Sequence, residues 1–587
     1  MQRTTSTHRR GYAAAALVVA LALSACEGDR GPAGPAGPQG PQGPQGPQGP
    51  GPAELEAACT PVSPLPAGLA PVVVALTSDG KLLRFSPASM SAGNTVSILG
   101  LAAGEAILGI DFRPADGALI ALTRVGTLGA LVRIDPLTGE VTRLTRVGAT
   151  SLTLNGDRYG VDFNPVPGAL RIVGDNDENY RIVFSGSGGM SYTVNVDTTL
   201  APTADVVAAA YTNNFAGTPL TTLYNLDATA NTLVTQGGID SVTNPNAGAL
   251  VTVGELGVDF DADAGFDIDG VSGLALAALN VAGAPSTGLY AVDLGSGAAS
   301  CIGTIPTAAG ERAVGLAIPP PQPAIAYGLT TADALVRFVP NAAGVASVSA
   351  PVAITGLGAG ETVVGMDIRP RTGALTLVTR NPATNGGALY EVDPMTGVAT
   401  AIPANMGQML AFDAGATDFG IDFNPVPNAL RIVNDANQNL RLPFPADTAG
   451  YNVVTDGAVN PVGDSAAAAY TQNFDGATST RLYVIDTTSN ELKFQNPPND
   501  GTQVVVGALG VSAASGNSGF DIIGGAGVTA AGVNIGNTVS FAALEVGGAS
   551  NLYRINLQTG AATQIGSGPI GGASPVTLKG LAVSVRR

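Results

Sequence analysis

The sequence has one histidine and no tryptophan. His8 lies in an N-terminal segment with the features of a removable signal, so the rest of the chain offers no imidazole. This excludes a Ser-His-Asp triad, a histidine-activated cysteine and any zinc or haem site that needs histidine. Carboxylates, tyrosines and arginines remain, and nothing in their spacing marks a paired acid and base. We therefore predict no catalytic residue.

Charged residues are also scarce, at 12% of the chain, with 27 basic and 45 acidic side chains. Removal of the signal takes away Arg3, Arg9 and Arg10 and leaves a net charge near −21. Nucleic acid and anionic lipid surfaces reward a positive face, so we expect neither as a partner. After the signal, no apolar run is long enough for a transmembrane helix.

The N-terminal signal ends in a lipoprotein-like cleavage motif. Arg9 and Arg10 precede the apolar run 13–23, which is too short to span a bilayer, and the run ends in Leu-Ser-Ala-Cys26. This tetrapeptide resembles a bacterial lipobox, which implies that residues 1–25 are removed and that Cys26 is lipidated. By the same resemblance, Glu27 favours the outer membrane. We expect a chain anchored in the bacterial cell envelope by lipid alone, either periplasmic or surface-exposed; an ordinary secretory signal is the alternative.

A strict glycine period follows the signal. Glycine occupies every third position from Gly28 to Gly49, mostly followed by proline. This collagen-like pattern suits a triple helix, and its prolines preset polyproline II. At about 3.1 Å per residue, the segment would extend roughly 70 Å. We predict a stalk over residues 26–58, and two outcomes stay open: a homotrimer through the stalk or a monomeric spacer.

The rest of the chain is duplicated. The segment Gly160–Arg181 recurs as Gly420–Arg441, and flanking segments recur in the same order: Gly109–Leu119 as Gly365–Leu375, and Ala209–Gly217 as Ala468–Gly476. We predict two homologous domains, residues 59–318 and 324–587, separated by the proline-rich linker 319–323.

Each copy has a shorter period of about 50 residues, which is typical of propellers or solenoids. Gly109, Gly160 and Gly257 open successive units of the first copy, with Ala208 filling the place between the last two, and turn signals divide each unit into four strands. We predict an all-β fold with two tandem β-propellers, each of about five four-stranded blades. Six blades per ring is the alternative.

Strands from both ends of each copy complete its last blade. In the first copy, strands at 72–76, 81–85 and 95–99 would be joined by 314–318; in the second, 324–338 would be joined by 580–583. Such closure removes free sheet edges. A single ring of ten blades is the rival topology. In an oxidising compartment we expect Cys59 and Cys301 to form a disulfide, with two unpaired buried thiols as the alternative. This bond is possible only if the first and last blades of one copy are neighbours, so we favour two rings.

These motifs resemble a known family. GIDFRPADGAL, YGVDFNPVPGALRIV, AAYTNNFAG followed by LYNLD, and GELGVDF, with FQNPPNDGT in the second copy, resemble the bacterial domain of unknown function 4394. The resemblance spans roughly residues 72–318 and 324–585. It implies a propeller-like, exported module and carries no activity or catalytic residue.

One acidic segment is a candidate metal site. Asp259, Asp261 and Asp263 alternate ahead of Gly265, with Asp267 and Asp269 beyond. Alternate carboxylates can collect oxygen ligands around calcium, although the glycine comes one place late for an EF-hand and Gly270 stands where a bidentate glutamate is needed. The alternative is an acidic, solvated turn. We expect no other cofactor.

Two further charged patterns repeat. We interpret Asp111, Asp162, Asp259, Asp367 and Asp422 as acceptors for the backbone of the following turn, and we prefer this to a ring of carboxylates at a channel mouth. Asp175 with Arg171 and Arg181, matched by Asp435 with Arg431 and Arg441, could form a polar ligand site between blades. We favour exposed charge pairs that anchor loops.

Two classes of function follow. The first is a surface-anchored, non-enzymatic scaffold whose propellers bind a glycan, protein or matrix ligand. The second is a calcium-assisted extracellular hydrolase or lyase that uses Asp259, Asp261 and Asp263. The anchor and the stalk favour the first.

Overall fold

A computed structural model describes residues 59, 61, 65, 71–341, 344–445, 449–524, 528–529, 532–533 and 538–585. Lipidation of Cys26 and the stalk at 26–58 therefore concern residues outside the described ranges, and both stay predictions. The described part is almost entirely β-structure, with five 3-10 turns, η1 (Ser187–Gly189), η2 (Ile239–Ser241), η3 (Pro245–Ala247), η4 (Asn405–Gly407) and η5 (Pro498–Asp500). None of its helices has the length and apolar character needed to cross a membrane.

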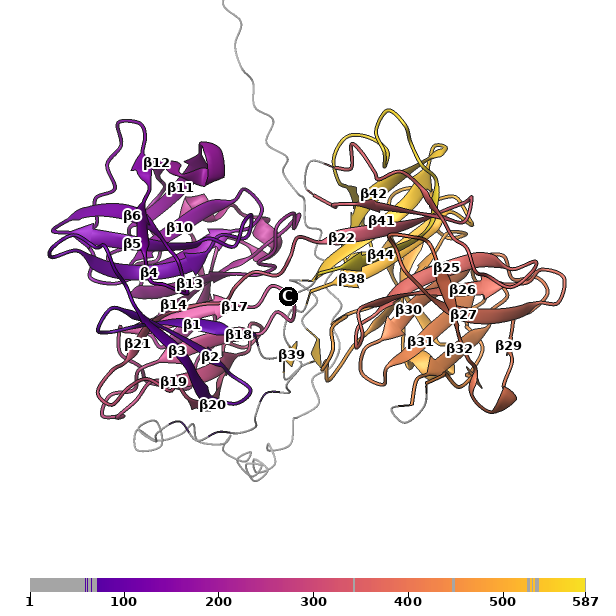
Figure 1. Ribbon diagram of the computed structural model, residues 1–587, viewed down its shortest axis with the longest axis horizontal. Helices are drawn as coiled ribbons and strands as arrows, with labels where there is room; N and C mark the ends of the chain where they lie inside the picture. The colour runs from indigo at the N-terminus through magenta and orange to yellow at the C-terminus, as the bar shows by residue number, and fades with distance from the viewer. Residues whose placement is uncertain are drawn as a thin grey trace, which may run out of the picture. The chain divides into compact units, whose positions relative to one another are not determined.

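The first copy forms five sheets of four antiparallel strands each, which are consecutive in the chain except where β21 joins β1 (Figure 1, indigo to magenta). The order from the innermost strand outward is β21 (Ala313–Ala317), β1 (Val73–Thr77), β2 (Lys81–Ser86), β3 (Ser91–Ser97); β4 (Ala106–Phe112), β5 (Leu119–Val125), β6 (Leu128–Ile134), β7 (Val141–Arg143); β9 (Tyr159–Asn164), β10 (Ala169–Gly174), β11 (Asn179–Ser185), β12 (Ser191–Val196); β13 (Val206–Tyr211), β14 (Leu223–Asp227), β15 (Thr232–Gln236), β16 (Leu250–Glu255); β17 (Ala264–Ile268), β18 (Ala275–Leu279), β19 (Gly288–Val292), β20 (Ala299–Thr304). The short β8 (Thr145–Arg146) adds to β12.

The second copy repeats the plan (Figure 1, red to yellow). Its sheets are β44 (Leu578–Ser584), β22 (Ile325–Thr330), β23 (Ala334–Phe338), β24 (Val352–Ala353); β25 (Thr362–Arg369), β26 (Ala374–Arg380), β27 (Gly386–Val392), β28 (Ala399–Ile402); β30 (Phe419–Asn424), β31 (Ala429–Asn434), β32 (Asn439–Pro443), β33 (Val454–Thr455); β34 (Ser465–Tyr470), β35 (Leu482–Asp486), β36 (Glu491–Gln495), β37 (Gln503–Ala508); β38 (Ser518–Ile523), β41 (Val539–Val546), β42 (Ala549–Ile555), β43 (Ala562–Gln564). The short β29 (Leu410–Ala411) adds to β27, and β39 (Val528–Thr529) pairs with β40 (Gly532–Val533).

Each copy closes on itself. The last strand of the first copy, β21, pairs antiparallel with its first, β1, and the register places Val74 opposite Ala317. In the second copy β44 pairs with β22, with Ala326 opposite Val583. The prediction of two rings of five blades, each closed by strands from both ends, is confirmed, and a single ten-bladed ring is excluded.

The apolar core of each ring is divided into layers between neighbouring blades. In the first ring, for example, Val73 and Leu83 of the first blade pack with Leu276 and Leu289 of the fifth. A disulfide joins the segment ahead of the first blade to the fifth blade, between Cys59 and Cys301, whose Cα atoms lie 5.5 Å apart. The ring closure and the disulfide therefore hold the same pair of blades.

The fifth inner strand begins later than we predicted. We expected Gly257 to open this unit, but β17 starts at Ala264, and Gly257 has a φ of +71°, which belongs to a turn. The second copy behaves alike, since its fifth inner strand is β38. The motif at 257–260 imitates the opening motif of other blades without forming an inner strand.

Candidate functional site

The inner strands of each ring share one four-residue pattern at the same register. A small residue is followed two places later by aspartate or alanine and then by a large apolar or aromatic residue. In the first ring the segments are GLAI (315–318), GIDF (109–112), GVDF (160–163), AAAY (208–211) and GFDI (265–268); in the second they are GLAV (580–583), GMDI (365–368), GIDF (420–423), AAAY (467–470) and GFDI (519–522).

The small first residue lets neighbouring inner strands approach closely. A Cβ atom on Gly160 would lie 2.7 Å from the carbonyl carbon of Ala208 on the next inner strand. A Cβ on Gly519 would lie 2.3 Å from the backbone nitrogen of Leu581. Neither distance is tolerated, so glycine is required by the narrow centre of the ring.

The aspartates tie each inner strand to the next. In the first ring Asp111 Oδ2 accepts the N–H of Phe163 at 2.7 Å, and Asp162 Oδ1 accepts that of Tyr211 at 3.0 Å. Asp267 Oδ2 accepts the N–H of Ile318 at 2.5 Å. In the second ring Asp367, Asp422 and Asp521 make the same bonds to Phe423, Tyr470 and Val583, at 2.7, 3.0 and 2.5 Å.

These bonds bring three carboxylates together inside each ring. Asp111, Asp162 and Asp267 form the first cluster, and Asp367, Asp422 and Asp521 form the second; within each cluster one oxygen per residue lies within 4.8 Å of the others. We call these the axial clusters. All six side chains are at most 1% exposed. The alanine variants of the pattern, in the two remaining blades of each ring, add no charge.

Burial makes the charged form of these carboxylates costly. It raises the pKa of Asp267 to about 8 and that of Asp521 to about 7. Burial, with the charge of a neighbouring aspartate as a second cause, also raises the pKa of Asp111, Asp162, Asp367 and Asp422 well above the usual range. Two unit charges about 5 Å apart repel by about 3 kcal/mol at an effective dielectric constant near 20. Three bare carboxylates in one cluster therefore need protons or a cation.

Our interpretation of the repeated aspartates was wrong in two respects. Asp111, Asp162, Asp367 and Asp422 bond to the next inner strand rather than to the following turn, and they do converge, which we had not favoured. Asp259 is exposed and lies outside the cluster, and Asp267 takes its place. The signal for Asp267 was the segment GFDI, which both copies retain.

The predicted calcium ligands have other partners in the structure. Asp263 Oδ1 accepts from Arg158 Nε at 2.6 Å, and Asp261 Oδ2 accepts from an Arg312 terminal nitrogen at 2.5 Å. Asp259 Oδ1 accepts from the Asn231 amide at 3.0 Å. Each carboxylate bonds to a side chain of another segment, which favours the interpretation of this segment as an acidic turn. Calcium binding here stays a prediction.

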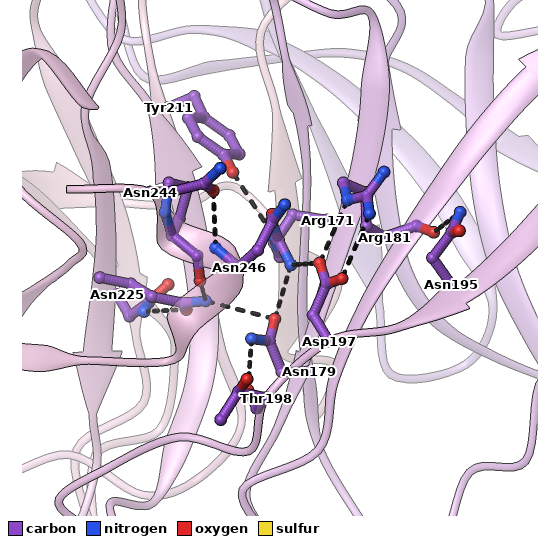
Figure 2. Close-up of polar contacts among 12 residues, drawn as sticks. Arg171, Asn179, Arg181, Asn195, Asp197, Thr198, Tyr211, Asn225, Asn244 and Asn246 are labelled. Atoms are coloured by element: carbon purple, nitrogen blue, oxygen red, sulfur yellow. Dashed lines mark hydrogen bonds and ion pairs between the residues drawn. The ribbon is translucent and has the colours of Figure 1, made fainter. Parts of the chain in front are cut away.

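Arg171 forms a buried polar network rather than an exposed charge pair, whereas Arg181, which contacts the network through Asp197, is 31% exposed (Figure 2). A terminal nitrogen of Arg171 donates to Asn179 Oδ1 at 2.7 Å and to Asp197 Oδ2 at 2.8 Å, and the other donates to Asn246 Oδ1 at 2.5 Å. Arg171 lies on the third blade and Asn246 on the fourth, so the network joins the two blades. Arg431 repeats these contacts with Asn439, Asp456 and Asn499.

Asp175 takes no part in this network, contrary to our prediction. Both Arg171 and Arg181 pair with Asp197, and Asp175 instead accepts the backbone N–H groups of Asp157 and Arg158. The Arg171 side chain is only 2% exposed, and its polar groups bond within the chain. The network is a structural tie between blades rather than a ligand site.

A groove on the second blade of the second ring is open to solvent. Its volume is about 800 Å³, and it is lined by Leu375, Glu391, Met395, Val398 and Ile402 among others. Met395 is 61% exposed and Val398 is 53% exposed. The lining contains Glu391 and Asp393 and no lysine or arginine, and a terminal nitrogen of Arg337 beside it donates to Met395 Sδ at 3.0 Å. The groove therefore combines exposed apolar surface with negative charge.

Fold and site together define a tandem five-bladed β-propeller protein with a closed carboxylate cluster inside each ring. The family model described as a domain of unknown function, DUF4394, matches residues 81–317 and 334–582, and the chain belongs to this family. This confirms the resemblance of both copies. A search of curated proteins finds no match.

Two solved structures among the matches show how weak the likeness is. A putative 6-phosphogluconolactonase from Bacteroides uniformis is 10% identical, with 85% of this chain and 98% of that chain covered and a TM-score of 0.22. A calcium-binding protein, regucalcin, from Agrobacterium tumefaciens is 13% identical, with 55% and 92% covered and a TM-score of 0.24. Likenesses this weak support no conclusion about activity.

Proposed function

We infer that the protein is a non-enzymatic binding scaffold held at the bacterial cell envelope by a lipid on Cys26, with two rigid propellers that present a ligand surface. The observation that carries this inference is the contrast between interior and surface in the duplicated rings. Both axial clusters and both arginine networks are repeated residue for residue. Several of the loops around them differ, although turns such as 164–168 and 424–428 are nearly the same in both copies.

The surface differences are chemical. The acidic segment that contains Asp261 and Asp263 is replaced in the second copy by a serine-rich segment, GVSAASGNSGF (510–520). The exposed turn residue Leu137 of the first ring corresponds to Met395 of the second, which borders the groove. A repeated framework with divergent surfaces is the organisation expected of a binding scaffold.

The positions of the axial carboxylates and of the groove favour binding over catalysis. The axial carboxylates are buried and bonded to the backbone, so a polymer substrate cannot reach them without opening the ring. The groove is exposed, and its lining carries Glu391 and Asp393, while Arg337 contacts it only at Met395, where a terminal nitrogen of Arg337 donates to Met395 Sδ at 3.0 Å. We expect its ligand to be a protein segment with apolar and basic side chains, since these complement exposed Met395 and Val398 beside Glu391.

Binding of defined peptides tests this function. We would immobilise the mature chain and titrate apolar-basic, apolar-acidic and neutral peptides, with neutral and acidic polysaccharides as further probes. Apolar-basic peptides should bind best, and Met395→Glu with Val398→Glu should weaken binding at least about tenfold. Leu137→Glu is the matched control at the equivalent turn of the first ring and should have no effect. Equal binding by both variants, or turnover of a polysaccharide, would refute the proposal.

A further inference from the structure

The axial clusters have features that a purely structural hydrogen bond does not explain. Asp162 and Asp422 each accept one backbone N–H, and the neutral oxygen of asparagine could accept the same bond without a buried charge. Asp111 and Asp267 use both oxygens, because each also accepts the N–H of the residue that follows it. Yet aspartate occurs at three of five inner-strand positions in both rings, and each set converges within 4.8 Å. The charge itself therefore needs an explanation.

Unpartnered oxygens next to the clusters point to a ligand. In the second cluster Asp422 Oδ2 and Asp367 Oδ1 are buried and have no hydrogen-bond partner. Asn473 Nδ2 lies 3.4 Å from Asp521 Oδ1, which places this amide at the cluster, and its buried Oδ1 also has no partner. A buried oxygen without a donor is costly unless something absent from the protein itself supplies positive charge.

The first ring carries the equivalent amide. Asn214 occupies the position of Asn473, immediately before the final phenylalanine of the repeated AAYT-x-N-F segment, and its side chain is 1% exposed. Neither its Oδ1 nor its Nδ2 has a partner. Both rings thus have three converging carboxylates and, at matching positions of the sequence, an asparagine whose buried amide oxygen has no partner.

We propose that each ring binds one divalent cation, calcium in preference to magnesium, between its three axial carboxylates. The first site consists of Asp111, Asp162 and Asp267, with the amide oxygen of Asn214 as a further ligand. The second consists of Asp367, Asp422 and Asp521 with Asn473. Three carboxylates and an amide form an all-oxygen, hard ligand set, which excludes soft metals.

Several physical features favour calcium. Calcium accepts irregular sets of oxygen ligands, whereas magnesium demands near-ideal octahedral geometry and usually keeps several waters. On one side of the second cluster, the cavity lined by Gly519 and Gly580 measures only about 10 Å³, room for about one water. On the other side, a pocket of about 160 Å³ reaches Asn473 and Val583 and offers an entry path.

Metal content of the mature full-length chain is the direct test. After chelation and dialysis against buffered calcium, elemental analysis should find about two calcium ions per chain, and calcium should raise the unfolding temperature more than magnesium does. Asp162→Asn and Asp422→Asn each keep an oxygen for the backbone N–H but remove one charge. Either variant should lose one ion per chain, and together they should lose both. Asp259→Asn, on an exposed loop, should lose none.

The unmodified chain keeps the test decisive even if a variant fails to fold. Absence of bound calcium at millimolar free ion, with an unfolding temperature that chelator leaves unchanged, would overturn the proposal. So would calcium that Asp259→Asn removes and Asp162→Asn retains, because that ion would lie on the acidic loop. Peptide binding at the groove measures the proposed scaffold function separately, so either idea can fail alone.

Discussion

Replacement of the buried arginine in either ring should destabilise that ring specifically. Arg171→Met keeps the aliphatic length of the side chain but removes the guanidinium that bonds to Asn179, Asp197 and Asn246. Arg431→Met does the same in the second ring. Both arginine side chains are 2% exposed, so water cannot replace the lost donors without disturbing the contact between the third and fourth blades.

The expected cost is about 3–5 kcal/mol in the free energy of unfolding of the mutated ring, the range for removal of one partner from a buried ion pair. Most of it comes from acceptors left without donors, each of which costs about 1–3 kcal/mol. Arg181 also pairs with Asp197 but is 31% exposed. Arg181→Met should therefore cost only about 0–1 kcal/mol.

Hydrogen exchange read by mass spectrometry can assign the effect to a ring. Peptides from β9–β16 should exchange faster in Arg171→Met, and peptides from β30–β37 should keep their protection; Arg431→Met should show the reverse. Equal losses in Arg171→Met and Arg181→Met would refute the reasoning, because burial would then have no influence. Uniform loss over both rings would contradict the independence of the two closures.

Three further predictions concern stability. Gly519→Ala should destabilise the second ring by about 1–3 kcal/mol in denaturant unfolding, because its Cβ would meet the backbone of Leu581. Gly415→Ala is the control: its Cβ has open space around it, so its free energy of unfolding should lie within about 0.5 kcal/mol of the parent. Reduction of Cys59–Cys301 should cost the first ring about 2–5 kcal/mol and leave exchange in the second ring unchanged. Burial raises the pKa of Asp464 to about 6, above its value in the unfolded chain, so its contribution to stability is present below pH 4 and is lost as the pH rises through 6. Asp464→Asn should therefore gain unfolding temperature relative to the parent between pH 4.5 and 7.5; a constant difference would contradict this assignment.

Ring closure could be predicted from the sequence because it depends on local strand patterns and on a duplication. The strands at 314–318 and 580–583 end copies that begin with unpaired strands, and a propeller removes that edge by joining them. Five blades per ring follow from the 50-residue period. These features require no knowledge of how side chains meet.

The axial clusters were missed for two physical reasons. First, GVDF at 257–260 repeats the letters of a true inner strand, but the positive φ of Gly257 makes it a turn. Comparison of the two copies identifies the true inner strand, because the second copy lacks the GVDF motif and keeps GFDI at 519–522. Second, Asp111 and Asp267 are far apart in the chain, and only closure of the ring brings them together.

The residues at the uncharged positions of the inner strands favour a bound cation over shared protons as the partner of the axial carboxylates. If aspartate served only to accept a backbone N–H, all five inner strands could carry it, yet Ala210 and Ala317 stand in two of the five places, and Ala469 and Ala582 repeat them. Three carboxylates around a divalent ion leave one net negative charge, which the backbone N–H donors can stabilise; five would leave three charges in a dry interior. One divalent ion therefore neutralises most of the charge of three aspartates, and both rings keep that number while several of their loops diverge.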